Sequence, residues 1–334
     1  MIAGVLDALA GLGTYSDALA WVVIAAFCTG VALERLGRTE RVGGGIDRRA
    51  ARYVTAGAWV TFGFFWLSLV HYYGIEGKSI VEGVLSLLAL PASIYVGVLL
   101  ARGRDSLFVL SRAVAAMGLI FLPFELIVPL QETLIEVVTR QTETLLTLVG
   151  YPSGGVYDVV SSAEYGKAPY RNTFVFTAAS DHTLTYTIRI ACTGIGSIAI
   201  VAGLIAAVRA PLSRKAEALA VSIPVIYGLN LVRNVFIAVA FGTQRLHVFP
   251  EFVASVFATD DPYLISYLVA DRILSQSLSI VALVGITWFV VRRLPEVLTI
   301  VEDVLYVVTR NEYDLRSAFD VETPDRTDRA GKAD

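Results

Sequence analysis

Reactive and charged side chains interrupt otherwise apolar stretches of this sequence at three places. Cys192 lies in the run RIACTGIGS, Arg233 lies between two asparagines in NLVRN, and Arg272 follows Asp271 in a third apolar run. A charged group inside a membrane span costs about 2.5–3.5 kcal/mol on insertion scales, and it marks a functional site by default. Nearby cations stabilise a thiolate nucleophile, and a fixed guanidinium can donate to the oxyanion that forms when a carbonyl is attacked. The three residues therefore predict thiol chemistry supported by arginines.

The composition places this chemistry in a membrane. Of the 334 residues, 55% are hydrophobic and 17% charged, whereas a soluble domain has about 45–50% apolar and about 25% charged residues. The formal net charge of −3 provides no basic field, so we expect no nucleic-acid partner. Two cysteines in apolar runs and three histidines form neither a disulfide framework nor a zinc pattern. We expect an all-α integral membrane protein without metal or cofactor.

The apolar stretches predict a polytopic bundle of about seven transmembrane helices. A crossing needs about 20 mostly apolar residues. The stretches that qualify are 17–33, 53–71, 80–101, 110–131, 188–208, 217–241 and 262–291. The milder stretch Met1–Gly13 is interpreted as an interfacial or half-inserted lead-in, and an eighth span there remains open.

The basic residues of the loops predict the orientation, because cytoplasmic loops are enriched in Lys and Arg. They concentrate after spans 1, 3 and 5 and at the end of span 7: Arg35, Arg38, Arg41, Arg48, Arg49, Arg52, Arg102, Arg104, Arg112, Arg209, Arg214, Lys215, Arg292 and Arg293. Lys78 is the one basic residue between spans 2 and 3, and Arg245 is the one between spans 6 and 7. The N-terminus is therefore expected outside and the C-terminus in the cytoplasm.

Residues 1–293 are expected to form the transmembrane domain, with an extracellular insert at 132–187. The insert is expected to begin with a helix to about Leu148. The polar–apolar alternation of 183–188 has the period of a strand. With 173–177 and the turn-like Ser180-Asp181, it predicts a short hairpin.

Beyond the last span, residues 294–309 are predicted to be an interfacial amphipathic helix. Residues 310–334 are charged and poor in large apolar side chains, as in a disordered cytoplasmic tail.

The depths of the three residues place them in the same leaflet. At 1.5 Å per residue, Cys192 lies about 6 Å, Arg233 about 12 Å and Arg272 about 15 Å inside the outer ends of their spans. A histidine is the usual base for a cysteine nucleophile. All three histidines, however, lie at outer boundaries or in outer loops: His71, His182 and His247. A cysteine enzyme would have to work with arginines.

Each residue also has an alternative structural interpretation. Cys192 can be a small packing residue, and Arg272 can pair with Asp271 or extend toward the interface. Asn230 lies one helical turn before Arg233 and is expected to orient it, and Asn234 is expected to support the site. Glu125, between two prolines, either faces the bundle as a partner of an arginine or is an interfacial charge.

At these residues the sequence resembles the exosortase/archaeosortase family, and within it the A-type archaeosortases most closely. The motifs are Ala191-Cys192-Thr-Gly194, Asn230-x-x-Arg233-Asn and Arg272, in the family's order and 41 and 39 residues apart. Arginine at the third position is the archaeosortase form, which implies an archaeal source. The resemblance covers about 50–293.

The resemblance implies a membrane-embedded cysteine transpeptidase. Its substrates would be exported surface proteins, such as S-layer glycoproteins, with a C-terminal sorting signal: a Pro-Gly-Phe motif, a transmembrane helix and a basic tail. Cys192 would be the nucleophile that forms an acyl-thioester, Arg233 the proton donor or acid–base group, and Arg272 the stabiliser of the transition state. A membrane phospholipid would accept the new C-terminus near the outer leaflet. Because an arginine has a pKa above 12, electrostatic stabilisation by both arginines is the physically safer role.

Other functions remain open from the sequence. In an anion transporter or channel, Arg233 and Arg272 would bind the anion and Cys192 would only pack. In a silent scaffold, the arginines would pair with Glu125 and Asp271. A protease that releases its product would use the same residues as a transpeptidase.

Overall fold

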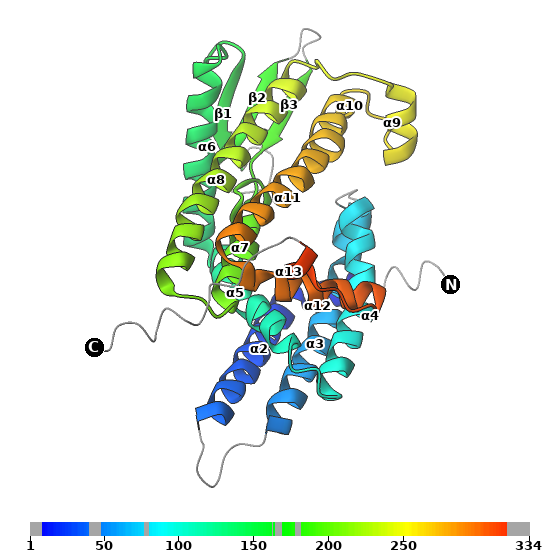
Figure 1. Ribbon diagram of the computed structural model, residues 1–334. Coiled ribbons are helices and arrows are strands. Elements are labelled where there is room, and N and C mark those ends of the chain that lie inside the picture. The colour runs from blue at the N-terminus through cyan, green and yellow to red at the C-terminus, as the bar shows by residue number, and fades with distance from the viewer. Residues whose placement is uncertain are drawn as a thin grey trace, which may run out of the picture.

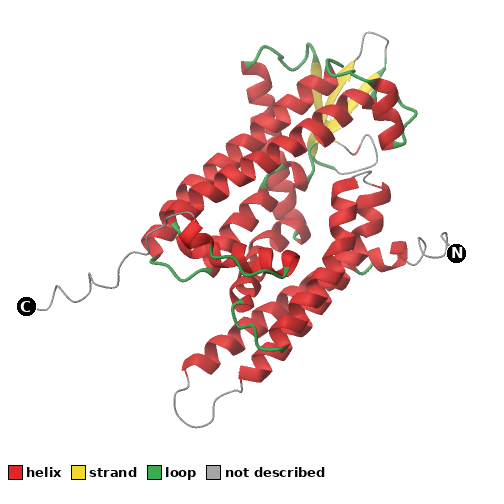
Figure 2. Ribbon diagram, turned by 45° about the vertical axis from the view of Figure 1, so that its right-hand side comes forward, coloured by secondary structure: helices red, strands yellow, loops and turns green. Residues whose placement is uncertain are grey.

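The computed structural model describes residues 9–39, 48–76, 80–161, 163, 169–177 and 182–318. The described chain is mostly helical, with one small sheet at one end of the molecule (Figures 1 and 2). Within the N-terminal lead-in, residues 9–13 are helical, and residues 1–8 lie outside the described part.

The first half of the chain forms a bundle of four apolar helices. They are α2 (Ser16–Thr39), α3 (Arg48–His71), α4 (Ile80–Ala101) and α5 (Leu107–Leu126). Helix α3 packs between α2 and α4, and α5 packs against α2 (Figure 1). The aromatic rings of Phe27, Trp59 and Phe62 meet edge to face in its core, with centroids 5.2–5.9 Å apart. The indole of Trp59 donates a hydrogen bond to Ser111 Oγ (2.9 Å), which satisfies both groups inside the bundle.

Helix α5 ends earlier than the predicted span 110–131. Ile127 is extended, and α6 (Val128–Leu148) begins in a new direction with Pro129 in its first turn. Pro129 lacks the N–H that would continue the helix toward the carbonyl of Glu125. The side-chain amide of Gln131 donates to that carbonyl instead (3.1 Å). The predicted helix to about Leu148 is present as α6.

A three-stranded antiparallel sheet follows, formed by β1 (Tyr157–Ser161), β2 (Arg171–Thr177) and β3 (Thr183–Thr187). The predicted hairpin is β2–β3, in which Thr173 pairs with Thr187; its turn lies outside the described residues. One face of the sheet, which includes Phe174, Phe176, Leu184 and Tyr186, is buried against α6 and α8. The sheet is therefore fixed to the helices by alternate apolar side chains.

The second half of the chain contains the helices that surround the sequence motifs. Helix α7 (Ile195–Ala207) packs against α5, and the long helix α8 (Leu212–Gly242) packs against α6 and α7. After the short helix α9 (Pro250–Phe257), a continuous helical segment runs through α10 (Leu264–Tyr267), a π-helical stretch (Leu268–Ser275) and α11 (Gln276–Arg293).

The structure does not confirm the expected count of seven spans. Among the described residues, six helices are long and apolar enough to cross a membrane: Ser16–Gly37, Arg48–Glu76, Val81–Ala101, Leu107–Leu126, Leu212–Gly242 and Leu264–Arg293. The predicted span 188–208 is only the 13-residue helix α7. Its first residues extend strand β3: the N–H of Ile188 donates to the carbonyl of Asn172 (2.8 Å), and Arg189 is extended. A helix of this length rises about 20 Å, less than the hydrocarbon thickness of about 30 Å.

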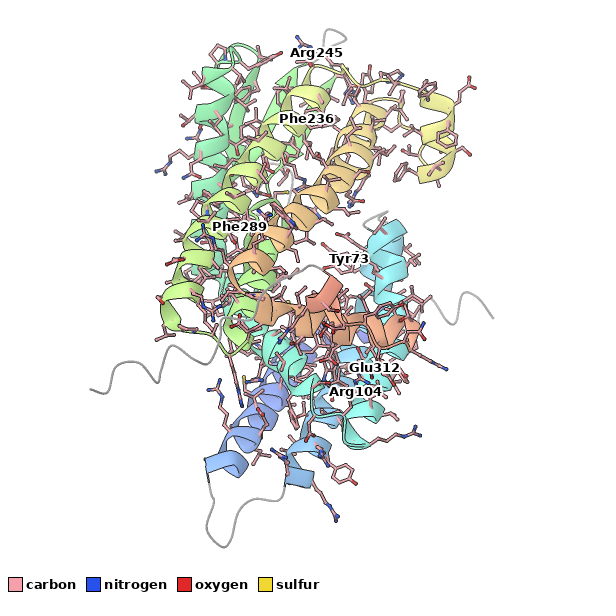
Figure 3. The ribbon with its side chains drawn as sticks, viewed as in Figure 1. Tyr73, Arg104, Phe236, Arg245, Phe289 and Glu312 are labelled. Carbon is pink, nitrogen blue, oxygen red and sulfur yellow. The ribbon has the colours of Figure 1, made fainter. Side chains whose placement is uncertain are left out.

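The chain after the last span returns to the first bundle. Helix α12 (Leu298–Thr309) packs against α5 and α4. Arg104, in the α4–α5 connection, contacts Glu312 (Nη1–Oε1 2.9 Å) and Asp303 (Nε–Oδ1 3.5 Å); Figure 3 labels Arg104 and Glu312 at this junction. The short helix α13 (Leu315–Ala318) lies within the segment predicted as a disordered tail, and residues 319–334 lie outside the described part.

An ion pair between α3 and the α4–α5 connection predicts a pH effect on stability. Arg52 donates two hydrogen bonds to Asp105 (2.7 and 2.9 Å), and the first cause of the lowered pKa of Asp105 is this bonding. A lowered pKa in the folded state means that the carboxylate stabilises the fold above its unfolded pKa of about 3.9. That contribution is lost as the pH falls through the folded pKa. We expect Asp105→Asn to lower the thermal midpoint at pH 7. On acidification, the midpoint of this variant should fall by less than that of wild type.

Thermal unfolding in detergent between pH 7 and pH 3 measures this difference. The exposed Asp260 is a suitable control, and Asp260→Asn should follow the wild-type curve. If Asp105→Asn shifts the midpoint equally at both ends of the pH range, the ion pair is not the cause.

Candidate active site

Cys192 lies where the sheet passes into helix α7. Strand β3 ends at Thr187, Ile190–Cys192 form a single 3-10 turn, and the N–H of Cys192 donates to the carbonyl of Arg189 (2.8 Å). Gly194 then adopts a left-handed conformation (φ 79°), after which α7 begins. The half-buried cysteine is therefore on a tight turn between two rigid elements rather than inside a helix.

Two asparagines of α8 fix the backbone of this turn. The side-chain amides of Asn230 and Asn234 both donate to the carbonyl of Cys192, at 2.6 and 2.8 Å. The two asparagines are four residues apart and therefore share one face of the helix. The hydroxyl of Tyr186 in β3 donates to Asn234 Oδ1 (3.3 Å). Burial raises the pKa of Tyr186 well above its ordinary value, so this hydroxyl remains a donor.

Arg233 extends from α8 beside these asparagines. Its guanidinium donates to Asp271 Oδ1 (2.5 Å), and it interacts electrostatically with the thiol of Cys192. The side chain is 25% exposed. Among the described residues, the bond to Asp271 is its one hydrogen bond, whereas a guanidinium has five N–H donors. Arg233 is thus held in place at one edge with donors left for another group.

Asp271 joins the two predicted arginines. Its side chain is 8% exposed and lies between Arg233 and Arg272, with Arg272 Nε 3.6 Å from Asp271 Oδ2. On its other side, Arg272 Nη1 is 3.8 Å from Glu82 Oε2 of α4. Both Asp271 and Arg272 belong to the π-helical stretch. Such wide turns in a helix are frequent at functional sites.

The structure therefore brings Cys192, Arg233, Asn230 and Asn234 together and links Arg272 to them through Asp271. Asp271 was not among the residues expected to act, because the sequence offered it only as a pairing partner of an arginine. The available signal was a carboxylate directly before an arginine in an apolar run.

Glu125 is not brought into this cluster by a salt bridge. Within the described part of the chain, no arginine lies within 4 Å of its carboxylate, and its Oε2 is buried without a hydrogen-bond partner. Two of the histidines contact groups other than Cys192. His71 Nδ1 is 3.2 Å from Glu76 Oε1, and the ring of His182 stacks on Tyr263 with centroids 4.2 Å apart. Cys28 packs beside the core of the first bundle.

Gly194 gives a prediction about the geometry of the turn. A β-carbon there would approach the side chain of Asn230 to 3.1 Å, and the positive φ is itself unfavourable for other residues. We expect Gly194→Ala to displace Asn230 and the Cys192 carbonyl that it holds. The rate of any reaction that uses the thiol of Cys192 should then fall by about 10-fold or more, as it does when active-site groups are misplaced. The control is Gly196→Ala, because a β-carbon there meets its nearest atom at 3.9 Å. Equal activity of the two variants would show that the turn does not position the cysteine.

Known proteins resemble the chain over almost its whole length. A sequence model of the family "transmembrane exosortase" matches residues 13–260. Archaeosortase A of Haloferax volcanii is 47% identical over 315 residues, which cover 91% of this chain and 98% of that protein. Archaeosortase A of Natronomonas pharaonis is 42% identical over 307 residues, with 91% and 93% coverage. No solved structure matches the chain. The chain therefore belongs to the exosortase/archaeosortase family of transmembrane proteins.

Proposed function

We propose that this protein is a membrane-embedded cysteine transpeptidase that anchors exported proteins to lipid. Its substrates are exported proteins with a C-terminal sorting signal that consists of a Pro-Gly-Phe motif, a transmembrane helix and a basic tail. The enzyme cleaves near the motif and transfers the new C-terminus to a membrane phospholipid. Support comes from relatives named archaeosortase A and from the family's sequence motif, which this chain contains.

The observation that carries the proposal is the pairing of a positioned cysteine with a restrained arginine. Two amides hold the carbonyl of Cys192, and the carboxylate of Asp271 holds Arg233. A pre-organised cation needs little reorganisation when negative charge develops near it, so it stabilises the transition state more than the ground state. The guanidinium of Arg233 can therefore stabilise the negative charge of a thiolate and of an oxyanion.

The reaction proceeds in two transfers. The thiolate of Cys192 attacks the scissile carbonyl, and the resulting oxyanion is stabilised by the guanidiniums of Arg233 and Arg272. When the C–N bond breaks, a thioester forms, and the C-terminal peptide leaves with a new amine that carries the proton lost by the thiol. A nucleophilic group of the acceptor headgroup then attacks the thioester and returns the thiol. The arginines act through charge and hydrogen bonding, because a guanidinium remains protonated.

The proposed orientation puts the site in the outer half of the membrane, with the N-terminus outside and the C-terminus in the cytoplasm. In this orientation, α7 and the non-helical residues before it together form one of the membrane crossings. The 31 residues of α8 rise about 46 Å, more than the hydrocarbon core of about 30 Å. Arg233 is 21 residues after Leu212, about 32 Å along this helix. The site therefore lies far from the basic connection between α7 and α8.

The scaffold alternative has one observation in its favour, since Asp271 does pair with both arginines. A scaffold, however, does not need the thiol of Cys192 to be intact. The intact mass of a substrate with the sorting signal, co-expressed with this protein, tests the proposed function. A truncated product with added lipid mass supports a transpeptidase, truncation without lipid identifies a protease, and a full-length substrate contradicts the proposal.

A further inference from the structure

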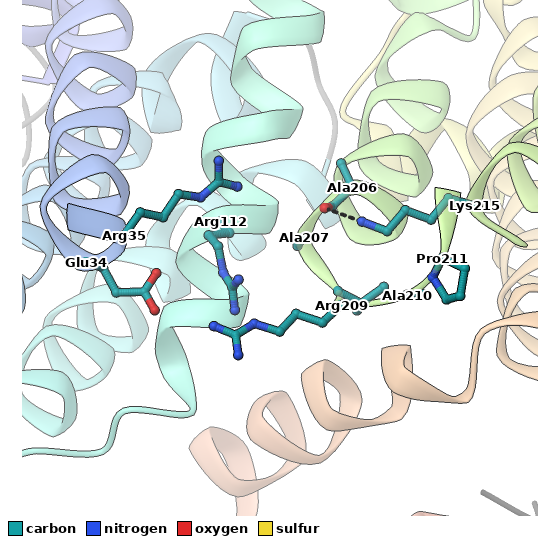
Figure 4. Close-up of a pocket in the computed structure, with 10 residues that line it drawn as sticks. Glu34, Arg35, Arg112, Ala206, Ala207, Arg209, Ala210, Pro211 and Lys215 are labelled. Atoms are coloured by element: carbon teal, nitrogen blue, oxygen red, sulfur yellow. Dashed lines mark hydrogen bonds between the residues drawn. The ribbon is translucent and has the colours of Figure 1, made fainter. Parts of the chain in front are cut away.

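A cavity of about 640 Å³ lies at the end of the helices opposite Cys192. It is lined by the last residues of α7, the connection to α8 and parts of α2 and α5 (Figure 4). Cys192 precedes the 13-residue α7, whereas the cavity surrounds its C-terminal end, about 20 Å away along the helix. The cavity is thus a separate feature from the candidate active site.

The walls of the cavity are strongly cationic. Four basic side chains from separate elements line it: Arg35 of α2, Arg112 of α5, Arg209 of the α7–α8 connection and Lys215 of α8. Glu34 is the acidic residue among the lining residues, and it is 3% exposed. In Figure 4 the side chains of Arg112 and Arg209 reach the same part of the cavity, beside the carboxylate of Glu34.

Lys215 and Arg112 each make one hydrogen bond within the described part of the chain. Lys215 Nζ donates to the carbonyl of Ala206 (2.9 Å), and Arg112 Nε donates to the carbonyl of Phe108 (3.3 Å). In the described part of the chain, no carboxylate lies within 4 Å of the guanidinium of Arg112 or of Arg209. By contrast, the nearby Arg214 is paired with Glu296 at 2.7 Å. The four cations of the cavity outnumber its one carboxylate, Glu34, and a bound anion lowers the repulsion among them.

We propose that this cavity binds the phosphate of an anionic phospholipid headgroup. Arg112 and Arg209 would hold the phosphate from two sides, since a guanidinium suits bidentate contact with phosphate oxygens. Lys215 would add a third cation. The apolar lining from Ala207, Val208 and Pro211 suits the glycerol end of a lipid. Basic pockets between transmembrane helices bind such headgroups, and a lipid bound here would bridge α2, α5 and α8 without entering the catalytic cluster.

The test uses the purified full-length protein in detergent and measures lipid binding by native mass spectrometry. The probes are phosphatidylglycerol, the zwitterionic phosphatidylcholine and inorganic phosphate. The double variant Arg112→Gln/Arg209→Gln is compared with Arg49→Gln/Arg102→Gln, which removes two exposed arginines outside the cavity. A third variant, Arg112→Lys/Arg209→Lys, keeps the charge.

We expect the cavity variant to bind phosphatidylglycerol about 10-fold or more weakly, the lysine variant to keep most of the binding, and the control to change it less than about 3-fold. Phosphatidylcholine binding should differ little among them. Thermal unfolding without lipid verifies that the variants are folded. Unchanged phosphatidylglycerol binding in the folded cavity variant overturns the proposal. Inorganic phosphate that binds through the two arginines while phosphatidylglycerol does not also overturns it, in favour of a free anion.

Discussion

Replacing Cys192 with serine or alanine is expected to leave a co-expressed substrate at its full length. The substitution removes the proposed nucleophile while leaving the backbone carbonyl that Asn230 and Asn234 hold. In an enzyme with covalent catalysis, loss of the nucleophile lowers the rate by more than about 10³-fold. The remaining groups can position the substrate and stabilise charge, but they cannot form the covalent intermediate. The fraction of substrate processed, measured by intact mass, gives the result directly.

The matched control is Cys28→Ser, since Cys28 is the other cysteine of the chain and packs beside the first bundle. It should process substrate as wild type does, apart from a small effect on stability. Processing by Cys192→Ala at the wild-type rate would exclude Cys192 as nucleophile. The scaffold and anion-transport alternatives would then explain the arginines better.

Asp271→Asn is expected to have the second largest effect. The side chain keeps its shape but loses the charge that restrains Arg233, which remains largely buried. A small misplacement of a group in an active site lowers the rate by about 10²-fold. We therefore expect processing to fall by about 10²-fold or more, with the protein still folded. The rate of substrate cleavage for the variant and wild type, at equal amounts of protein in the membrane, measures the effect.

Two further variants separate positioning from general destabilisation. Glu82→Gln removes the half-exposed carboxylate on the other side of Arg272, and it should lower the rate less than about 5-fold because exposed ion pairs contribute little. Asp271→Asn should slow the Arg233→Gln variant much less than it slows wild type, since Asp271 bonds Arg233 directly and contacts Arg272 only at 3.6 Å. Independent, additive losses in the double variant would show that Asp271 does not work by holding this arginine.

The sequence predicted most of the helices and one strand pair because both depend on local patterns. Apolar length identified six spans, and the alternation of 183–188 identified the β2–β3 hairpin. Strand β1 was not predicted, since Val159 and Val160 are adjacent apolar residues rather than alternate ones. The length of α7 was overestimated for a related reason. Residues 188–194 are apolar enough for a span, but hydrogen bonding to β2 and the left-handed Gly194 keep them out of the helix.

The pairings within the candidate site could be predicted only in part. Asn230 was predicted to orient Arg233 and Asn234 to support the site, but the structure shows both amides bound to the Cys192 carbonyl. Helical periodicity assigns faces at 3.6 residues per turn, and a π-helical stretch changes that assignment. Asp271 lies in such a stretch and pairs with Arg233 across 38 residues, whereas the sequence offered it only as a possible partner of an arginine.

The most direct test of Cys192 as the nucleophile is to trap the covalent intermediate. Wild-type protein is mixed with a sorting-signal substrate in membranes, quenched in acid, digested and analysed by mass spectrometry. We predict a substrate fragment attached to the peptide that contains Cys192, absent from the Cys28 peptide and released by hydroxylamine, as a thioester is. An attachment at another residue, or cleavage by an enzyme whose Cys192 peptide stays unmodified throughout turnover, would contradict the account.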